Sequence, residues 1–181
     1  VGIDRIGSNK QDMFHREKDL GAYKIVIRLK REDDCARTNG FFGFPIGANL
    51  EGINNSNIET ESKSIKGYFI YLGIEENRVV IVNDITAGYR LYTVQQGKNI
   101  YFSDDHEYLL DIIQINDGIQ IDENEYLYWT RHRYTTGART YIKYLDKVPP
   151  ASLIEIGAGG MKSRIYFEDL TPIPDAHSHY L

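Results

Sequence analysis

The sequence predicts an α+β protein, and three observations carry that prediction. The chain has 181 residues, a length that suits one domain and leaves no room for two of full size. Its 14 tyrosines and 7 phenylalanines favour half-buried strands, in which the rings pack inward while the hydroxyls reach water. The third observation is the order of the elements. Strands come first, then two helices, then a hairpin, so strands and helices do not alternate as in a parallel α/β protein.

Composition excludes several classes of partner. Hydrophobic residues make up 41% and charged residues 26%, values close to globular averages and far from those of a disordered chain. The formal charge of -5 has the wrong sign for a surface that neutralises phosphates, so we expect no nucleic-acid partner. The longest apolar runs, 68–74 and 79–82, are far shorter than the roughly 18 residues of a membrane span, so we expect no membrane partner.

The first twenty residues are polar and show no sustained period, which predicts an arm. Over the segment 23–30, apolar residues alternate with mostly polar ones, and this alternation predicts the first strand. From 31 to 66 the chain is rich in Gly, Asn, Ser and Thr, which indicates loop and short strands.

The densest strand signal follows that region. Segments 67–74 and 78–83 flank a short polar turn and predict a hairpin. Two shorter strands are expected at 90–94 and 99–103. We expect these four strands to form one antiparallel meander.

Two helices come next. Asp104 with an acidic residue three positions later is a capping-box variant, and apolar residues at helical spacing follow it, so a helix is predicted over 104–114. Asp122 repeats the signal and predicts a second helix over 122–132. The acidic residues in these first turns complement the helix dipole and need no catalytic role.

A last hairpin is predicted from 152–156 and 163–167, with a glycine-rich turn at 157–160. The glycines could suggest a phosphate loop, but such a loop opens a helix whose N-terminus holds the anion. Here a strand follows, so the segment is interpreted as a turn.

Side chains with reactive potential are few. Cys35 cannot form an internal disulfide, which suits a reducing, cytoplasmic location. Its neighbours Asp33 and Asp34 would raise the pKa of the thiol, so we expect no reactive thiolate. Of the five histidines only His177 and His179 have ligand-like spacing, and no third ligand lies near them in the sequence, so we expect no metal site. Taken alone, these residues predict no enzyme.

Four segments follow the order of motifs in one known family. Residues 67–74 resemble its Gly-x-Phe-Ala strand, and 82–92 resemble its Arg-Asp-x-x-Gly-x-x-Pro-Leu-Tyr segment. Residues 100–110 resemble its Phe-Ala-Ser-Glu-x-x-x-Leu-Leu step, and 137–153 resemble its Pro-x-Thr-x-Phe-x-x-Ile-x-x-Leu-Pro-Pro-Gly motif. By these motifs residues 66–168 resemble the distal half of the amino-terminal domain of asparagine-synthetase-type proteins, a class II glutamine amidotransferase domain with the Ntn-hydrolase fold. Three positions depart from the second motif, namely Asn83, Ala87 and Arg90.

This resemblance implies an αββα sandwich with two stacked antiparallel sheets. We expect both predicted helices on one outer face, and Phe69, Tyr71, Val80, Val82 and Phe102 between the sheets. The implied organisation is a polar arm over 1–20, the amidotransferase-like domain over 21–168, and a linker over 169–181 towards a C-terminal synthetase domain. Motif residues expected to shape the structure are Asp84, Leu91, Tyr92, Phe102, Thr140, Pro149 and Pro150, the two prolines fixing the start of the last hairpin.

The resemblance does not extend to the catalytic residues of the family. Members that hydrolyse glutamine carry an amino-terminal cysteine, whose α-amino group takes the proton of its own thiol. This sequence begins with Val1, which has no nucleophilic atom. Asn39 and Gly40 resemble a remnant of the family's Asn-Gly-Glu oxyanion motif, although a bare Asn-Gly is also a common turn. We therefore predict no catalytic residue, and take Asn39 and Gly40 as a candidate oxyanion remnant.

Two functional hypotheses stay open. The first is a catalytically silent, amidotransferase-like domain of an asparagine-synthetase-like protein, which acts as scaffold or interface for a C-terminal ATP-pyrophosphatase-type synthetase domain. The second is the glutamine-hydrolysing, ammonia-supplying half of an asparagine synthetase whose nucleophile is missing from this sequence. Under both, the resemblance implies no cofactor in this domain, with ATP and Mg bound only by the synthetase domain. A homodimer is an open alternative for the assembly.

Overall fold

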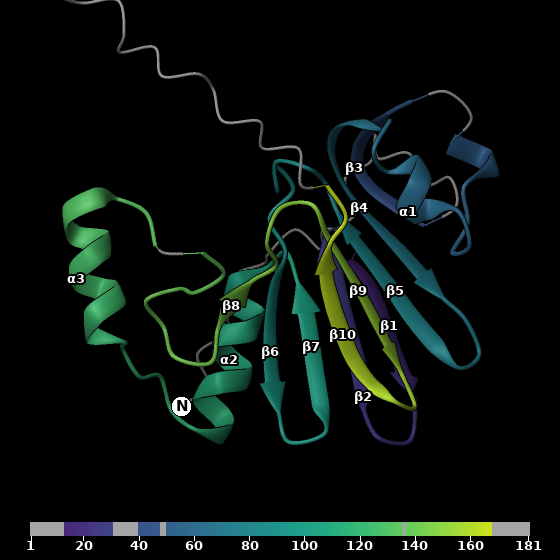
Figure 1. Ribbon diagram of the computed structural model, residues 1–181. Coiled ribbons are helices and arrows are strands. Elements are labelled where there is room, and N and C mark those ends of the chain that lie inside the picture. The colour runs from purple at the N-terminus through teal and green to yellow at the C-terminus, as the bar shows by residue number, and fades with distance from the viewer. Residues whose placement is uncertain (1–12, 31–39, 48–49, 136, 168–181) are drawn as a thin grey trace, which may run out of the picture.

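The computed structural model describes residues 13–30, 40–47, 50–135 and 137–167. They form two stacked five-stranded sheets with a few short helices, which confirms the predicted α+β class (Figure 1). Sheet A has the order β1 (Met13–Asp19), β2 (Lys24–Lys30), β7 (Asn99–Ser103), β6 (Tyr92–Gln96) and β8 (Asp146–Lys147). Sheet B has the order β10 (Gly160–Ile165), β9 (Ser152–Gly157), β5 (Arg78–Asn83), β4 (Lys66–Ile74) and β3 (Phe41–Ile46). The helical segments are η1 (Leu50–Gly52), α1 (Ile58–Glu61), α2 (His106–Asn116) and α3 (Glu123–His132).

One hydrophobic core joins the two sheets. Sheet A contributes Ile25, Ile27, Leu29, Ile100 and Phe102, and sheet B contributes Ile70, Leu72, Val79, Ile81, Ile154 and Ile156. All of these side chains are buried, and burying each one stabilises the fold by about 1.5–3 kcal/mol. The alternation of β2, which predicts a strand with one apolar face, therefore points that face at the partner sheet.

Sheet B is buried on its second face as well. There Phe69, Tyr71, Val80 and Val82 pack against Ile58 of α1 and neighbouring residues of the 50–65 segment. We expected these four side chains between the sheets, and that prediction is wrong. Phe102 does lie between the sheets, as expected. The error has a physical reason: β4 and β5 are covered on both faces, so no polar position in them marks which face is inner.

Helix α2 covers the outer face of sheet A. Its Leu109 and Ile113 are buried in a cluster with Val94 of β6. The N-cap is Asp105, whose carboxylate accepts the Glu107 N–H at 3.2 Å, and not Asp104 as the capping-box pattern predicts. The layers thus run α1, sheet B, sheet A, α2.

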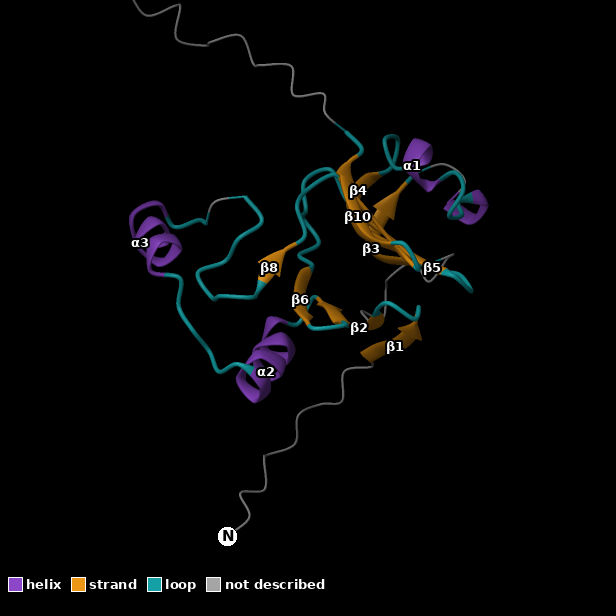
Figure 2. Cartoon of the chain, turned by 60° about the horizontal axis from the view of Figure 1, so that its bottom comes forward, coloured by secondary structure: helices purple, strands orange, loops and turns teal. Residues whose placement is uncertain are grey.

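Helix α3 begins after the N-cap Asp122, as predicted, and ends at His132, followed by the C-cap Arg133 in a left-handed conformation with φ of 65°. It covers neither sheet but stands to one side of the sandwich, beyond β8 (Figures 1 and 2). The expectation that both helices share one outer face is therefore wrong. Among the described residues the longest helix is the 11-residue α2, and none is long and apolar enough to span a membrane.

The strand pairings confirm both predicted hairpins, β4–β5 and β9–β10, but not the meander. Strands β4 and β5 belong to sheet B, whereas β6 and β7 belong to sheet A, so the segment 84–91 carries the chain from one sheet to the other. Sheet A also contains a parallel pair, β2 with β7, in contrast to the purely antiparallel sheets expected.

Several elements were not expected from the sequence, among them β1, α1 and the two-residue strand β8. Strand β1 lies within the predicted polar arm 1–20 and pairs antiparallel with β2 at the edge of sheet A. Polar edge strands are common because they discourage pairing with other chains, and such strands carry little apolar signal. Helix α1 has only four residues, of which Ile58 is buried. Residues 1–12 of the arm and the predicted linker 169–181 lie outside the described residues.

Candidate functional site

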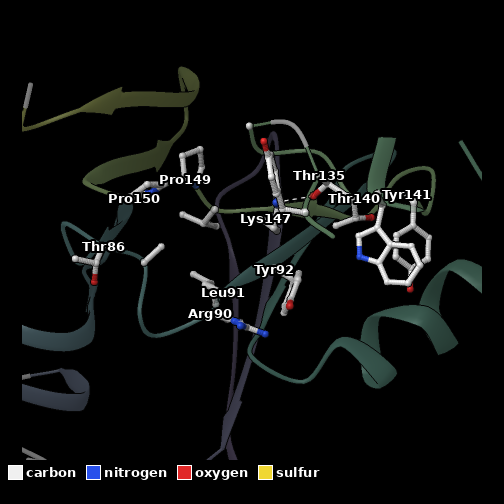
Figure 3. A pocket seen from close by; sticks show the side chains of 15 residues that line it. Thr86, Arg90, Leu91, Tyr92, Thr135, Thr140, Tyr141, Lys147, Pro149 and Pro150 are labelled. Atoms are coloured by element: carbon white, nitrogen blue, oxygen red, sulfur yellow. Dashed lines mark hydrogen bonds between the residues drawn. The ribbon is translucent and has the colours of Figure 1, made fainter. Parts of the chain in front are cut away.

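A cavity of about 430 Å³ lies where the crossover segment 84–91 and the start of β6 face the segment that leads from α3 to β9 (Figure 3). Such a volume is typical of sites for small molecules. The lining residues are Thr86, Ala87, Arg90, Leu91, Tyr92, Trp129, Tyr134, Thr135, Gly137, Thr140, Tyr141, Lys147, Val148, Pro149 and Pro150.

Asp84 fixes the crossover side of the cavity. Its buried carboxylate accepts hydrogen bonds from the backbone N–H groups of Thr86 (2.8 Å), Gly88 (3.1 Å) and Tyr89 (3.1 Å), and from that of Phe69 (3.2 Å). Four N–H groups on one carboxylate hold a tight turn that would otherwise leave buried donors unpaired. The turn thereby places Thr86 and Arg90 at the cavity.

The opposite side is held by Thr140 and Asn83. The Thr140 hydroxyl lies 2.8 Å from the carbonyl oxygen of Leu145 and 3.0 Å from that of Ile142, and it accepts the Ile142 N–H at 3.1 Å. The buried Asn83 amide donates to the carbonyls of Val148 (3.1 Å) and Pro149 (3.2 Å). These bonds fix the path of the chain into β9, and Pro149 and Pro150 lie directly before that strand.

Two cations and no carboxylate are present among the residues that line the cavity. Lys147 Nζ donates to the Thr135 hydroxyl at 2.7 Å. Burial lowers the pKa of Lys147, the nearby Glu125 carboxylate raises it, and the like charge of Arg90 lowers it. Arg90 thus lies close enough to Lys147 for their charges to interact, and the cavity carries a positive local charge in a chain whose net charge is -5.

Aromatic rings form the side of the cavity next to α3. The Trp129 and Tyr141 ring centroids lie 5.3 Å apart, and Tyr126 stacks on Trp129 at 6.1 Å. The Asp122 N–H also donates to the Tyr141 carbonyl at 2.9 Å. Through these contacts α3 is attached to the rest of the chain, and its indole ring is brought to the cavity.

The three threonine hydroxyls of the cavity are committed to structural bonds. Thr86 donates to the Asp84 carboxylate at 2.7 Å, Thr135 donates to the Arg139 carbonyl at 2.8 Å, and Thr140 is engaged as described above. A nucleophilic hydroxyl needs a base poised to take its proton. Among the cavity-lining residues there is no histidine or carboxylate for that purpose, and the amine next to a threonine hydroxyl is that of Lys147.

Five of the motif residues taken from the sequence come together here: Leu91, Tyr92, Thr140, Pro149 and Pro150. Asp84 does not line the cavity, but its carboxylate holds the turn that carries Thr86. Phe102 lies in the core between the sheets and not at the cavity. The sequence did not single out Lys147, Trp129, Thr86 or Thr135. Arg90 stood out only as a departure from the family motif.

The candidate oxyanion residues are not part of this cavity. Gly40 lines a second cavity of about 410 Å³, in which the Tyr71 hydroxyl donates to Asn55 at 2.7 Å and the Asn55 amide donates to Glu75 at 2.8 Å. Gly40 has φ of 86°, and its carbonyl accepts the Leu72 N–H at 2.8 Å, so its conformation serves the β3–β4 pairing. Asn39 lies outside the described residues, as do Val1, Cys35, His177 and His179.

The described part of the chain contains no group of three or more His, Cys, Asp or Glu residues that could hold a metal ion. His15 lies in β1, where its Nε2 is 3.5 Å from Oε1 of Glu17. His106 opens α2, and His132 ends α3 with its ring 4.4 Å from that of Tyr128. The three described histidines are thus dispersed over separate elements.

Comparison with known proteins gives a structural likeness but no sequence match. No protein-family model and no curated protein matches the chain. Among solved structures, glutamine phosphoribosylpyrophosphate amidotransferase from B. subtilis, complexed with ADP and GMP, is similar with a TM-score of 0.43 and 16% identity over 67% of this chain. The chain spans 20% of the length of that protein.

Proposed function

We propose that this chain is an amidotransferase-like domain that serves as scaffold and interface for an amide-forming synthetase domain, and that it does not hydrolyse glutamine. The sequence motifs of the asparagine-synthetase type support the family assignment. The observation that carries the functional part is the state of the cavity: five motif residues line it, the three threonine hydroxyls bond acceptors within the chain, and no histidine or carboxylate is among the lining residues.

The interface role is supported by α3. The helix stands off the sandwich and exposes Leu127 and Tyr126 to 56% and 44%, with Ile119 and Ile121 exposed in the preceding segment. Large apolar side chains that gather on a projecting element are typical of docking surfaces. We assign this surface to the ATP-pyrophosphatase-type synthetase domain, whose own ATP and Mg would supply the energy of amide formation.

Co-elution tests the interface. The chain and the synthetase domain of the same gene product are purified separately, mixed and passed over a size-exclusion column. We expect co-elution, with loss of the complex in Leu127→Lys, because a charge on the docking surface must be desolvated on binding. Met161→Lys is the matched control, since Met161 is similarly exposed on β10, away from α3. A gene product without a synthetase domain, or equal loss of the complex in both variants, would contradict the proposal.

A further inference from the structure

We propose that the cavity at Arg90 and Lys147 is a binding site for a small aromatic anion, a ring that carries a carboxylate or a phosphate. This inference goes beyond the scaffold role and does not rest on it, because the docking residue Leu127 is not among the residues that line the cavity.

The charge of the cavity selects an anion. The chain has 26 acidic and 21 basic residues, yet the residues that line this cavity include two cations and no carboxylate. Glu125 is the carboxylate whose charge raises the pKa of Lys147, and it balances part of the positive charge from outside the lining. A guanidinium presents a planar fork of donors that suits carboxylate and phosphate alike.

The ammonium group of Lys147 is already placed for an oxyanion. Lys147 Nζ is held by the Thr135 hydroxyl at 2.7 Å, which fixes the end of a long side chain before any ligand arrives. An ammonium group has three hydrogens, and the bond to Thr135 uses one of them. An anion that enters the cavity would thus meet a positioned cation and lose little side-chain entropy on binding.

The aromatic rings of the lining favour an anion that itself contains an aromatic ring. The half-buried Trp129 and Tyr141 lie next to each other in the lining of the cavity, and Tyr92 is a third ring of the same lining; Tyr92 and Tyr141 are labelled in Figure 3. Aromatic faces attract other rings in offset or edge-to-face arrangements. A volume of about 430 Å³ holds one small organic molecule and is too small for a folded partner, so we assign the site to a small molecule.

Trp129 also makes the site measurable, because it is the only tryptophan in the 181 residues. Its intrinsic fluorescence is followed while the purified chain is titrated with benzoate, phenyl phosphate, inorganic phosphate or benzyl alcohol. We expect saturable changes with the two aromatic anions, and the tighter of the two identifies carboxylate or phosphate as the natural head group. Benzyl alcohol, which has the ring without the charge, is expected to bind at least about tenfold more weakly.

Arg90→Gln is the decisive variant, since Arg90 is exposed and its loss should not disturb folding. It is expected to raise the dissociation constant about tenfold, the effect of losing one charge-assisted hydrogen bond. Lys162→Gln on β10 removes an equal charge outside the cavity and is expected to leave binding unchanged. The proposal is overturned if no titration saturates, if benzyl alcohol binds as well as the anions, or if both variants weaken binding equally.

Discussion

Two hydrogen bonds join Phe69 and Asp84. The Phe69 N–H donates to the Asp84 carboxylate at 3.2 Å, and the Asp84 N–H donates to the Phe69 carbonyl at 3.1 Å. Because the same carboxylate caps the turn at 86–89, one buried side chain connects the last residues of the β4–β5 pair to the crossover between the sheets. The cavity therefore depends on a residue that does not line it.

Asp84→Ala should destabilise the fold by about 3 kcal/mol or more, because it leaves buried backbone donors without an acceptor. Asp84→Asn keeps one carbonyl oxygen and should cost less. Urea denaturation followed by circular dichroism measures both. Equal stability of Asp84→Ala and the unmodified chain would show that the carboxylate does not hold the crossover.

Gly40→Ala tests whether Gly40 is needed for structure. A Cβ there would lie 2.2 Å from the Leu72 carbonyl oxygen, and φ is 86°, so we expect a loss of several kcal/mol by the usual cost of clash and backbone strain. Gly97→Ala is the matched control, since Gly97 has φ of 57° with open space around its Cα. That variant should lose only about 1 kcal/mol. Similar losses in the two variants would rule out the clash.

Thr140→Val should loosen the segment between α3 and β9. The change keeps the shape but removes the hydroxyl that bonds Ile142 and Leu145, at a cost of about 1–2 kcal/mol. Thr140→Ser restores the hydroxyl and should recover most of the stability. Hydrogen exchange at the Ile142 amide is the sensitive measurement, and unchanged protection in Thr140→Val would argue against this role.

Tyr166 should make the fold sensitive to high pH. Burial raises the pKa of its phenol to about 12 from an ordinary value of 10.0, with the Ser62 bond opposing and the Asp84 charge adding to the shift. The folded state therefore keeps a proton that the unfolded state has lost, so this contribution is complete below pH 10 and is lost as the pH rises towards about 12. In Tyr166→Phe the decrease in stability between those pH values should be smaller. An unchanged pH profile would exclude Tyr166 as its source.

The sequence predicted the strands whose apolar signal is strong or alternating, such as β2 and the β4–β5 hairpin, and failed where the signal is non-local. The pairing of β2 with β7 joins residues about seventy-five positions apart, and nothing in either strand specifies a parallel partner. The division of β4–β7 between two sheets depends on the turn at Asp84, whose hydrogen bonds no periodicity reveals. β1 and α1 were missed because an edge strand is polar and a four-residue helix has no period.

The motif residues Leu91, Tyr92, Thr140, Pro149 and Pro150 could be selected from the sequence because the family resemblance marks them. Arg90, Lys147 and Trp129 could not, since isolated cations and a tryptophan on a helix more often serve solubility or packing. Only the fold brings the three to one cavity, across some sixty residues of chain. A positive charge at the position where the family motif departs was the one signal available for Arg90.

Ammonia release tests the central claim most directly. The purified chain is incubated with millimolar glutamine, beside a Cys35→Ser variant and a Val1→Cys variant with a free amino terminus. We predict release at background from the unmodified chain, because the three threonine hydroxyls of the cavity are held in bonds within the chain and no histidine or carboxylate lines it to activate one. Turnover by Val1→Cys alone would fit the same account, with a pocket that lacks only its nucleophile. Saturable turnover by the unmodified chain would contradict it, and loss of that turnover in Cys35→Ser would identify the residue responsible.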